Sequence, residues 1–498
     1  MIAKRSAIAL LVALAAVVTL LLLPRLYLHG LDDAGLLAND EAIYCDMARE
    51  MVTGGHPSEV RYEGEVYFPR PPAAFWAIAA SDLIGGLAPP EHGLRIVTAL
   101  LPTIEVLLTV LLGCMLFSPF VGVLGAALLA TADLFVGYAR TFESEPLLCC
   151  FVLGAFCAWV GAKRRAWLYV VYGTCLGGAL MTKQLVGLFP LAAPLVDGYL
   201  ALRGNRERGS RQNVGRGLAI GVGVALIVAL PWHLLMYARH GHRFVDSFFL
   251  ESLVVRARVS LLRRTTPAFY LVGLWTSERG PFAVWWLGAS LLALWAGLRR
   301  ASCRGELLLG GWVLGPLLLY SLARSRYDYY ILLCYPAYAL SAAWLVAKLP
   351  LRSSLRTLLA VALVVLSAAV HLPRNLTRNP GTSEQRSLLA AASGVPKNVP
   401  LYVFNLRPYV ARVYTERVVR VFVDEPSDVP AAEALRASGM PAPAELARPP
   451  NTALELARRP SLLMLPAARF SITEGVPSSS AQLLAESKRY RLYLLPRR

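Results

Sequence analysis

The sequence predicts a mainly α-helical fold: a polytopic bundle of transmembrane helices followed by a small C-terminal α/β domain. Hydrophobic residues make up 56% of the 498 residues and the mean hydropathy is +0.51, more than a soluble enzyme tolerates. Apolar runs long enough to cross a bilayer fill most of the chain up to about His371. The formal charge of +18 does not indicate nucleic-acid binding, because Lys and Arg gather in the short loops between these runs.

The N-terminal residues 1–23 begin with Lys4 and Arg5 and stay apolar over the thickness of a hydrocarbon core. No small-residue cleavage site follows, so we expect a retained anchor with its N-terminus in the cytoplasm. The next segment is rich in Asp and Glu up to about Arg70, which marks the outer side and defines a first periplasmic loop at residues 24–92. Within this loop, residues 71–92 are too short to span and predict an interfacial helix.

The later apolar runs alternate between the two sides of a bilayer. We expect spans at residues 95–117, 119–136, 147–161, 166–181, 184–201, 217–236, 281–298, 306–322, 330–348 and 356–371. This alternation places every Lys- and Arg-rich loop that the positive-inside rule assigns to the cytoplasm on the cytoplasmic side. The total is about 11 spans, and up to about 13, in a bacterial inner membrane, and the sidedness is better determined than the count.

The C-terminal part changes character and becomes rich in proline and charge. We expect strands at residues 401–404, 418–423, 461–465 and 490–494, with helices at residues 431–438 and 453–459 between them. This alternation predicts a small α/β domain at residues 372–498 on the periplasmic side, after a transmembrane domain at residues 1–371. Because it carries no glycine-rich phosphate loop and no acid–histidine set, we expect it to handle the acceptor or to contribute stability.

Two acidic sites lie at the outer membrane level. Asn39 can cap a helix that runs to Met51, which places Asp40 and Glu41 in its first turn, where acidic side chains interact favourably with the helix dipole. Capping alone explains this pair equally well. The second site, Glu145 with Arg140, stands at the same depth before another span. Such groups are costly beside lipid unless they face a cavity, which favours a functional site.

Basic and aromatic side chains occur on the same side. Arg70 lies among prolines, Lys183 lies in a tight turn between two spans, and Arg324 and Arg326 precede Tyr329. A lipid-linked phosphate requires such neutralising groups, and arginine can bind it through two parallel hydrogen bonds. Interfacial snorkelling is the alternative for each cation, and it is the stronger interpretation for Arg326.

The sequence assigns no metal ligands. The eight cysteines show no spacing typical of zinc or iron–sulfur sites, and most are small hydrophobic residues within apolar spans. The nearby His233, His240 and His242 have no regular ligand spacing. No cofactor is therefore predicted, and a divalent metal stays open as an alternative.

The first-loop motif resembles the signature of the GT-C class of membrane glycosyltransferases, in particular the protein O-mannosyltransferase-like and lipid A aminoarabinose transferase families. It reads Asp40-Glu41-Ala42-x-Tyr44-x-x-x-Ala48-Arg49-Glu50-Met51. Four later motifs match in order: Tyr67-Phe68-Pro69-Arg70-Pro71-Pro72-x-x-x-Trp76, Arg140-Thr141-x-x-Ser144-Glu145-Pro146, Thr182-Lys183-x-x-Val186-Gly187 and Ala323-Arg324-x-x-x-x-Tyr329-Tyr330-Ile331-Leu332. The resemblance covers roughly residues 1–345. Pro69 stands where aminoarabinose transferases tend to have an acid, and Gln184 replaces a common glycine.

The resemblance implies an inverting transferase that moves a sugar from a polyprenyl phosphate donor to a lipid acceptor, such as lipid A or another glycolipid, or to a protein. Asp40 would then be the general base, with Glu41 positioning it or a loop amide and Glu145 orienting acceptor or sugar. Arg70, Lys183 and Arg324 would stabilise the phosphate as it departs. The substrate-binding set implied in this way is Tyr44, Arg70, Arg140, Lys183, Arg324, Arg326 and Tyr329.

Two other classes of function compete with this one. A transporter or flippase for a lipid-linked or anionic solute would also need many spans and outward basic groups. Transporters, however, place polar residues near the bilayer midplane and often show internal repeats, and neither pattern is present in this sequence. A catalytically inactive scaffold that uses the C-terminal part is the third class.

Overall fold

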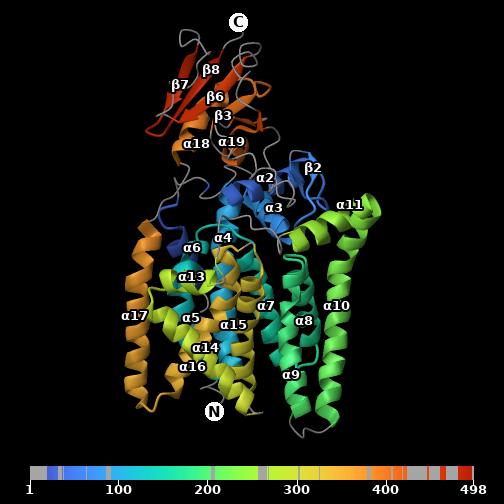
Figure 1. The fold of residues 1–498 in the computed structure, drawn as a ribbon, viewed down its shortest axis with the longest axis vertical. Helices are drawn as coiled ribbons and strands as arrows, with labels where there is room; N and C mark the ends of the chain where they lie inside the picture. The colour runs from blue at the N-terminus through green and yellow to red at the C-terminus, as the bar shows by residue number, and fades with distance from the viewer. Residues whose placement is uncertain are drawn as a thin grey trace.

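A computed structural model shows three levels along the long axis of the molecule: a helical bundle, a layer of short helices and a hairpin over one end, and a β-sheet beyond that layer (Figure 1). It describes residues 19–31, 36, 39–62, 64–85, 91–203, 208–255, 266, 268–300, 303–324, 326–377, 383–404, 408–417, 419–422, 446–447, 460–466 and 481–495. Most of the expected N-terminal anchor at residues 1–23 lies outside the described residues. The helix Thr19–Leu28 begins within the last part of this anchor.

The predicted helical membrane bundle is confirmed. Its helices are α4 (Glu91–Leu116), α5 (Pro119–Thr131), α6 (Asp133–Tyr138), α7 (Glu145–Gly161), α8 (Leu168–Leu180), α9 (Ala192–Arg203), α10 (Arg208–His240), α14 (Pro281–Arg299), α15 (Arg304–Leu322), α16 (Tyr335–Lys348) and α17 (Ser353–Thr377). Each of the ten spans expected between residues 95 and 371 coincides with a helical segment. Within the described part of the chain, seven helices are long and apolar enough to cross a membrane, and five shorter apolar helices accompany them.

The start of α5 shows how local sequence sets these helices. Ser118 caps the helix, because its hydroxyl oxygen accepts a hydrogen bond from the Val121 amide at 3.3 Å, and Pro119 occupies the first helical position, where no amide is needed. A Cβ on Gly122 would lie 2.5 Å from the Val110 carbonyl oxygen, so only glycine lets α5 approach α4 this closely.

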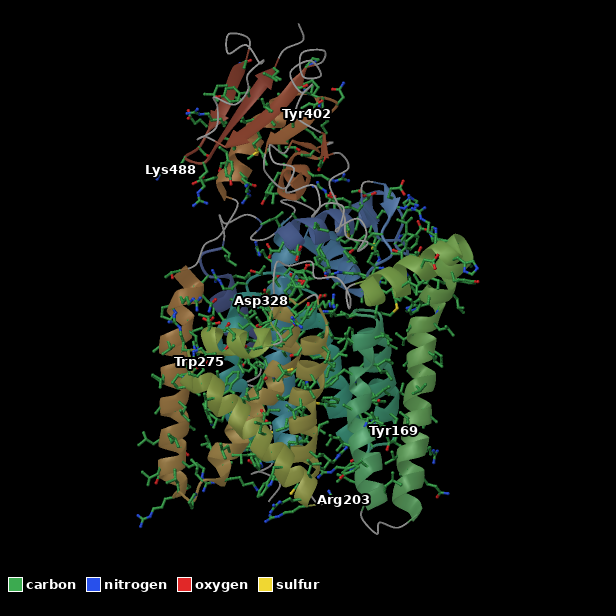
Figure 2. All side chains as sticks on the ribbon, viewed as in Figure 1. Tyr169, Arg203, Trp275, Asp328, Tyr402 and Lys488 are labelled. Atoms are coloured by element: carbon green, nitrogen blue, oxygen red, sulfur yellow. The ribbon has the colours of Figure 1, made fainter. Side chains whose placement is uncertain are left out.

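The two ends of the bundle differ in chemistry. Arg203 lies at the end away from the sheet and Asp328 lies at the end that faces it (Figure 2). Near the end of α9, Asp197 is buried and pairs with Arg304, with 2.6 Å between Oδ1 and Nε. The Trp159 indole also donates to Asp197 at 2.9 Å. Arg203 follows the expected span at residues 184–201 and Asp328 precedes the expected span at residues 330–348, and the two residues lie at opposite ends, as the alternation of the spans requires.

The layer above the bundle is formed by the first loop. It comprises α2 (Asn39–Thr53), β1 (Arg61–Tyr62), β2 (Glu65–Val66) and α3 (Ala73–Gly85). The later outer loop adds α11 (His242–Val245) and a π-helical segment at Asp246–Val255, whereas α13 (Phe269–Ser277) lies within the bundle and contacts α14 and α15 (Figure 1). The short apolar α3 stands where the sequence predicts an interfacial helix.

The acidic side chain of Glu59 connects the hairpin to the end of α10. Glu59 accepts hydrogen bonds from Arg61 Nη2 at 2.7 Å and Arg239 Nη1 at 3.0 Å, and His240 Nε2 lies 3.3 Å away. Burial opposes the charge on Glu59, yet these hydrogen bonds lower its pKa to about 2. The first loop and α10 are therefore held together by charge at the bundle's rim.

The C-terminal part forms a six-stranded sheet in the order β5-β4-β3-β6-β8-β7. The strands are β3 (Leu401–Phe404), β4 (Val419–Phe422), β5 (Leu446–Ala447), β6 (Ser461–Pro466), β7 (Gln482–Glu486) and β8 (Tyr490–Leu495). Strand β3 pairs in parallel with β4 and β6, whereas β8 is antiparallel to β6 and β7. Helices α18 (Ser383–Ala390) and α19 (Pro408–Thr415) pack with the sheet through an apolar cluster that includes Leu389, Val403 and Ala411.

The small C-terminal sheet that the sequence predicts is present, and the four expected strands coincide with β3, β4, β6 and β8. The sequence did not predict β5, β7, α18 or α19. The expected helices at residues 431–438 and 453–459 lie outside the described residues. The domain boundary at residues 371 and 372 stays a prediction, because α17 continues to Thr377.

We expect Gly122→Val to destabilise the bundle by about 1–3 kcal/mol, because the added side chain would collide with the α4 backbone. Thermal unfolding of the purified protein in detergent measures this loss. Gly223→Val on α10 is the matched control, since that glycine is exposed and a Cβ there meets nothing within 4 Å. Equal melting temperatures for the two variants would contradict the close α4–α5 contact.

Candidate active site

Glu41 joins three segments that are far apart in the sequence. Its carboxylate is fully buried and pairs with Arg95 of α4, with 2.8 Å from Nη1 to Oε1 and 3.2 Å from Nη2 to Oε2. The Phe142 amide also donates to Glu41 Oε1 at 2.7 Å. Both carboxylate oxygens are thus occupied, so Glu41 holds the loop between α6 and α7 against the first turn of α2.

Asp40 differs from its neighbour. Its side chain is only partly buried, and it lies close enough to Arg70 and Glu143 to affect the charge of both. Within the part of the chain that the structure describes, the Asp40 carboxylate forms no hydrogen bond or ion pair. It is therefore available to a substrate.

The proline motif is fastened to the turn between α8 and α9. The Ala73 amide donates to the Met181 carbonyl at 3.0 Å. The Gln184 side-chain amide donates to the carbonyl oxygens of Pro69 at 2.8 Å and Phe248 at 2.9 Å. The glutamine that departs from the family's glycine thus has a structural role, because it holds the backbone beside Arg70 next to the turn that carries Lys183.

Arg70 reaches from this motif towards the two acidic sites. Its Nη1 donates to the Ser144 hydroxyl at 3.3 Å, and its guanidinium carbon lies 5.1 Å from the centre of the Tyr44 ring. Burial opposes the charge, yet the groups around Arg70, with Tyr329 and Glu143 foremost, raise its pKa above the ordinary value. The guanidinium therefore stays charged and can bind an anion.

Tyr44 provides an aromatic wall beside Arg70. Its ring stacks on Phe75 at 5.1 Å between centroids and meets Phe142 edge-on at 5.0 Å. The Tyr44 hydroxyl is buried and has no hydrogen-bond partner among the described residues. A buried hydroxyl without a partner is unfavourable, which indicates that a ligand or water completes this position.

Lys183 and Glu145 form a buried ion pair, and the Ser144 hydroxyl donates to the other Glu145 oxygen at 3.3 Å. The Lys183 ammonium also lies 4.2 Å from the centre of the Tyr330 ring and 5.9 Å from that of Tyr329. Burial lowers the pKa of Lys183, and the attraction of Glu145 opposes that shift. The ion pair thus places a second cation near Arg70.

Glu143 belongs to the same cluster, although the sequence analysis did not select it. Its side chain is 4% exposed, and its Oε2 atom has no hydrogen-bond partner among the described residues. Burial raises the pKa of Glu143 well above its ordinary value, and Asp40 and Glu145 add to this shift. Perturbed carboxyl groups of this kind are typical of functional sites. The sequence feature that could have identified Glu143 is its position two residues before Glu145.

The remaining predicted residues have other surroundings. Arg140 is buried, and its Nη1 donates to the carbonyl oxygens of Tyr27 at 2.7 Å and His29 at 2.9 Å, which ties the loop to the first helix. Arg326 is buried and donates to the Ser321 carbonyl at 2.8 Å, whereas Arg324 is exposed. Substrate binding by these three arginines stays a prediction. Tyr329 is buried beside Lys183.

The described residues contain no group of three or more His, Cys, Asp or Glu side chains that could hold a metal ion. His233 Nδ1 lies 2.8 Å from the Ala229 carbonyl within its own helix. His240 lies beside Glu59 at the rim. The groups that meet in the site are instead three carboxylates and two cations: Asp40, Glu143, Glu145, Arg70 and Lys183.

Comparison with known proteins shows what the chain is similar to. Residues 69–234 match the family described as dolichyl-phosphate-mannose-protein mannosyltransferase. The chain is 27% identical over 318 residues to the undecaprenyl phosphate-alpha-4-amino-4-deoxy-L-arabinose arabinosyl transferase of Edwardsiella ictaluri, and 28% identical over 335 residues to that of an Enterobacter species. These matches cover 62% and 66% of this chain, and 55% and 58% of the relatives' own length.

Solved structures show the fold. ArnT from Cupriavidus metallidurans bound to undecaprenyl phosphate matches with a TM-score of 0.71 at 18% identity, over 98% of both chains. The chain has the GT-C fold. An oligosaccharyltransferase from Archaeoglobus fulgidus matches with a TM-score of 0.55 at 14% identity, over 83% of this chain and 64% of its own. The predicted resemblance to the GT-C glycosyltransferases is confirmed. The prediction of a multi-pass inner-membrane protein is confirmed as well.

We expect Glu143→Gln to stabilise the folded protein at high pH. A carboxyl group whose pKa is raised by folding binds a proton more readily in the folded state, so stability falls as pH rises above the unfolded pKa of about 4.3. The neutral amide removes this loss. The gain in melting temperature over wild type should therefore be larger at pH 8 than at pH 4.

The matched control is Glu65→Gln, because Glu65 has a side chain that is 80% exposed in the same loop layer. Its melting temperature should follow that of wild type across the pH range. A Glu143→Gln protein that is less stable than wild type at pH 8 would contradict a raised pKa.

Proposed function

We propose that this protein is an inverting glycosyltransferase that moves a sugar from a polyprenyl-phosphate-linked donor to a lipid or protein acceptor. We place its site on the periplasmic side, where the acidic first loop is expected. One observation carries the proposal: Asp40, whose carboxylate forms no hydrogen bond or ion pair with the described residues, lies near Arg70 and in one cluster with Glu143 and Lys183 at the end of a membrane bundle. A base next to an anion-binding pair is what displacement of a lipid phosphate requires.

The donor phosphate binds between Arg70 and Lys183 in this proposal. Arg70 presents a planar donor group, and Lys183 exchanges part of its contact with Glu145 for contact with the phosphate. Both cations are partly shielded from water, which strengthens their interaction with an anion. The arabinosyl transferases that this chain resembles are named for undecaprenyl phosphate, and the ArnT structure with the TM-score of 0.71 contains it.

Asp40 acts as the general base. It accepts the proton of the acceptor hydroxyl, whose oxygen forms a bond to the anomeric carbon of the sugar. The bond from that carbon to the phosphate oxygen breaks, and the electron pair leaves with the phosphate. Arg70 and Lys183 stabilise the charge that returns to the phosphate in this step. A single displacement of this kind inverts the anomeric configuration.

An amino sugar suits the acidic side of the site. The Asp40 carboxylate forms no hydrogen bond or ion pair with the described residues, and the Glu143 Oε2 atom has no hydrogen-bond partner among them. With Asp40 acting as the base, Glu143 would bind the amino group of a sugar, such as the one that the relatives' names give for the donor. Aminoarabinose transferases tend to have an acidic residue where this chain has Pro69. We therefore propose the class of amino sugars and not one particular sugar.

We expect Asp40→Asn to abolish transfer while preserving the fold, because the amide fits the same space but cannot accept the proton. Radiolabelled sugar on a panel of polyprenyl phosphates, offered to membranes, measures transfer and names the substrates. Asp246→Asn is the matched control, since Asp246 is exposed at the outer rim. Full transfer by the Asp40 variant, or a product with retained configuration, would refute this mechanism. A donor that only changes leaflet would indicate a flippase.

We expect Arg70→Ala to weaken binding of the polyprenyl phosphate by about tenfold or more, because a hydrogen bond to a charged group contributes about 1.5–3 kcal/mol. Binding of undecaprenyl phosphate to the purified protein measures the change. Arg243→Ala removes a rim arginine whose side chain is 71% exposed and serves as the control. Equal affinity in both variants would remove Arg70 from the phosphate site.

A further inference from the structure

Helix α19 of the C-terminal part packs against α2, the helix that begins with the acidic pair. Val410 and Val413 of α19 are 3% and 2% exposed, and they lie in one apolar cluster with Ala42 and Met47 of α2. The same cluster contains Phe142, which precedes Glu143. The core around the candidate site is therefore completed by a helix more than 250 residues further along the chain.

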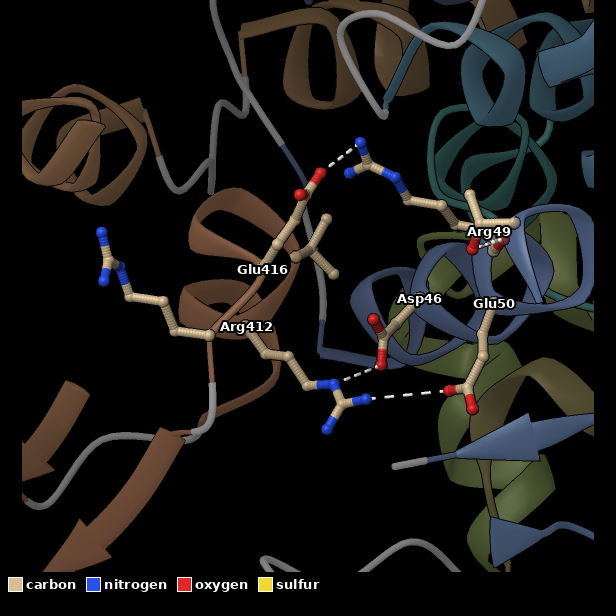
Figure 3. Close-up of a pocket in the computed structure, with 8 residues that line it drawn as sticks. Asp46, Arg49, Glu50, Arg412 and Glu416 are labelled. Atoms are coloured by element: carbon tan, nitrogen blue, oxygen red, sulfur yellow. Dashed lines mark hydrogen bonds and ion pairs between the residues drawn. The ribbon is translucent and has the colours of Figure 1, made fainter. Parts of the chain in front are cut away.

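Arg412 of α19 makes the charged part of this contact. Its Nε lies 2.7 Å from Asp46 Oδ2 and its Nη2 lies 3.7 Å from Glu50 Oε2 (Figure 3). Its guanidinium carbon is 5.1 Å from the centre of the Tyr62 ring. One side chain thus connects two successive turns of α2 and the first-loop hairpin.

Two further contacts fix the ends of the same interface. Arg49 forms an ion pair with Glu416 just after α19 (Figure 3). The Leu36 amide donates to the Tyr414 hydroxyl at 3.0 Å, four residues before Asp40. Contacts at residues 36, 46, 49 and 50 together restrain both the start and the length of α2.

We propose that α19 is a clamp that positions Asp40 for catalysis, with Arg412 as its principal positioning residue. The inference rests on the proposed function, because it assigns Asp40 the role of base. A helix is stiff over its 15 residues, so a tilt or shift at Asp46 and Glu50 is carried to Asp40 at its first turn. The C-terminal part then controls the chemistry without contacting the substrate.

The expected sizes of two effects, the loss of stability and the loss of reaction rate, distinguish a positioning role from simple stabilisation. The ion pairs line a pocket of about 560 Å³ between α2 and α19, and the side chains of Arg412, Asp46 and Glu50 are 19%, 16% and 22% exposed. Partly exposed ion pairs contribute little to stability, because water and salt screen them. A displacement of about 1 Å at a catalytic group, however, can reduce a rate by about 100-fold. Loss of the clamp should therefore slow the reaction far more than it destabilises the fold.

The test compares three variants of the full-length protein. Arg412→Asp repels Asp46 and Glu50, whereas Arg412→Lys keeps the charge but loses the paired donor geometry. Arg491→Asp is the matched control, since it changes the same charge in β8 and breaks a 2.7 Å pair with Glu486 away from α2. Steady-state transfer and hydrogen exchange of the amides at residues 39–53 are measured for each.

We expect Arg412→Asp to lower kcat by about tenfold or more with the donor KM within about twofold of wild type, because binding groups stay in place. Its amides at residues 39–53 should exchange faster, Arg412→Lys should be intermediate, and Arg491→Asp should match wild type. A wild-type kcat in Arg412→Asp, or unchanged exchange in this segment, would overturn the clamp. Absence of transfer by wild type itself would refute the proposed function, and hydrogen exchange would still decide the clamp.

Discussion

The buried ion pair between Glu41 and Arg95 is the contact on which the site depends. It crosses 54 residues of sequence and adds the Phe142 amide to the same carboxylate. Removing one partner would leave an uncompensated charge in a dry environment, at a cost of about 3–5 kcal/mol. The pair therefore fixes the relative position of α2, α4 and the loop before α7, and with it the distance between the two acidic sites.

Around the Glu41–Arg95 pair, the site contains charged groups that would be unfavourable elsewhere in the fold. Glu143 is buried with an oxygen that lacks a partner among the described residues, and Asp40 has no ion pair there. Arg70 and Lys183 compensate these carboxylates only in part, since Lys183 already pairs with Glu145. Such a balance costs stability in the free protein, and it favours a ligand that carries both a phosphate and a polar or cationic sugar.

The sequence was sufficient for the bundle and for much of the site. Hydropathy located the ten expected spans between residues 95 and 371, because a bilayer requires long apolar runs whatever their packing. It did not locate α11 or α13 in the outer loop between them. Motif spacing selected Asp40, Arg70, Glu145 and Lys183, which the structure brings together. The resemblance assigned Glu41 a positioning role, but the sequence could not show that its partner is Arg95, since that contact crosses 54 residues. Glu143 was missed because local sequence does not show which acid of a close pair finds a cation.

The interface between α19 and α2 was also beyond the sequence, for a different physical reason. Helix α19 has only eight residues. The charged side chains on α2 that pair with it cannot be distinguished, in the sequence alone, from ordinary solvent-exposed groups. Only the fold shows that Arg412 meets Asp46 and Glu50. The last helix of the bundle, α17, leads the chain back towards the layer that contains Asp40, and this return is what allows α19 to contact α2 and, in the proposed clamp, to set the geometry of the site.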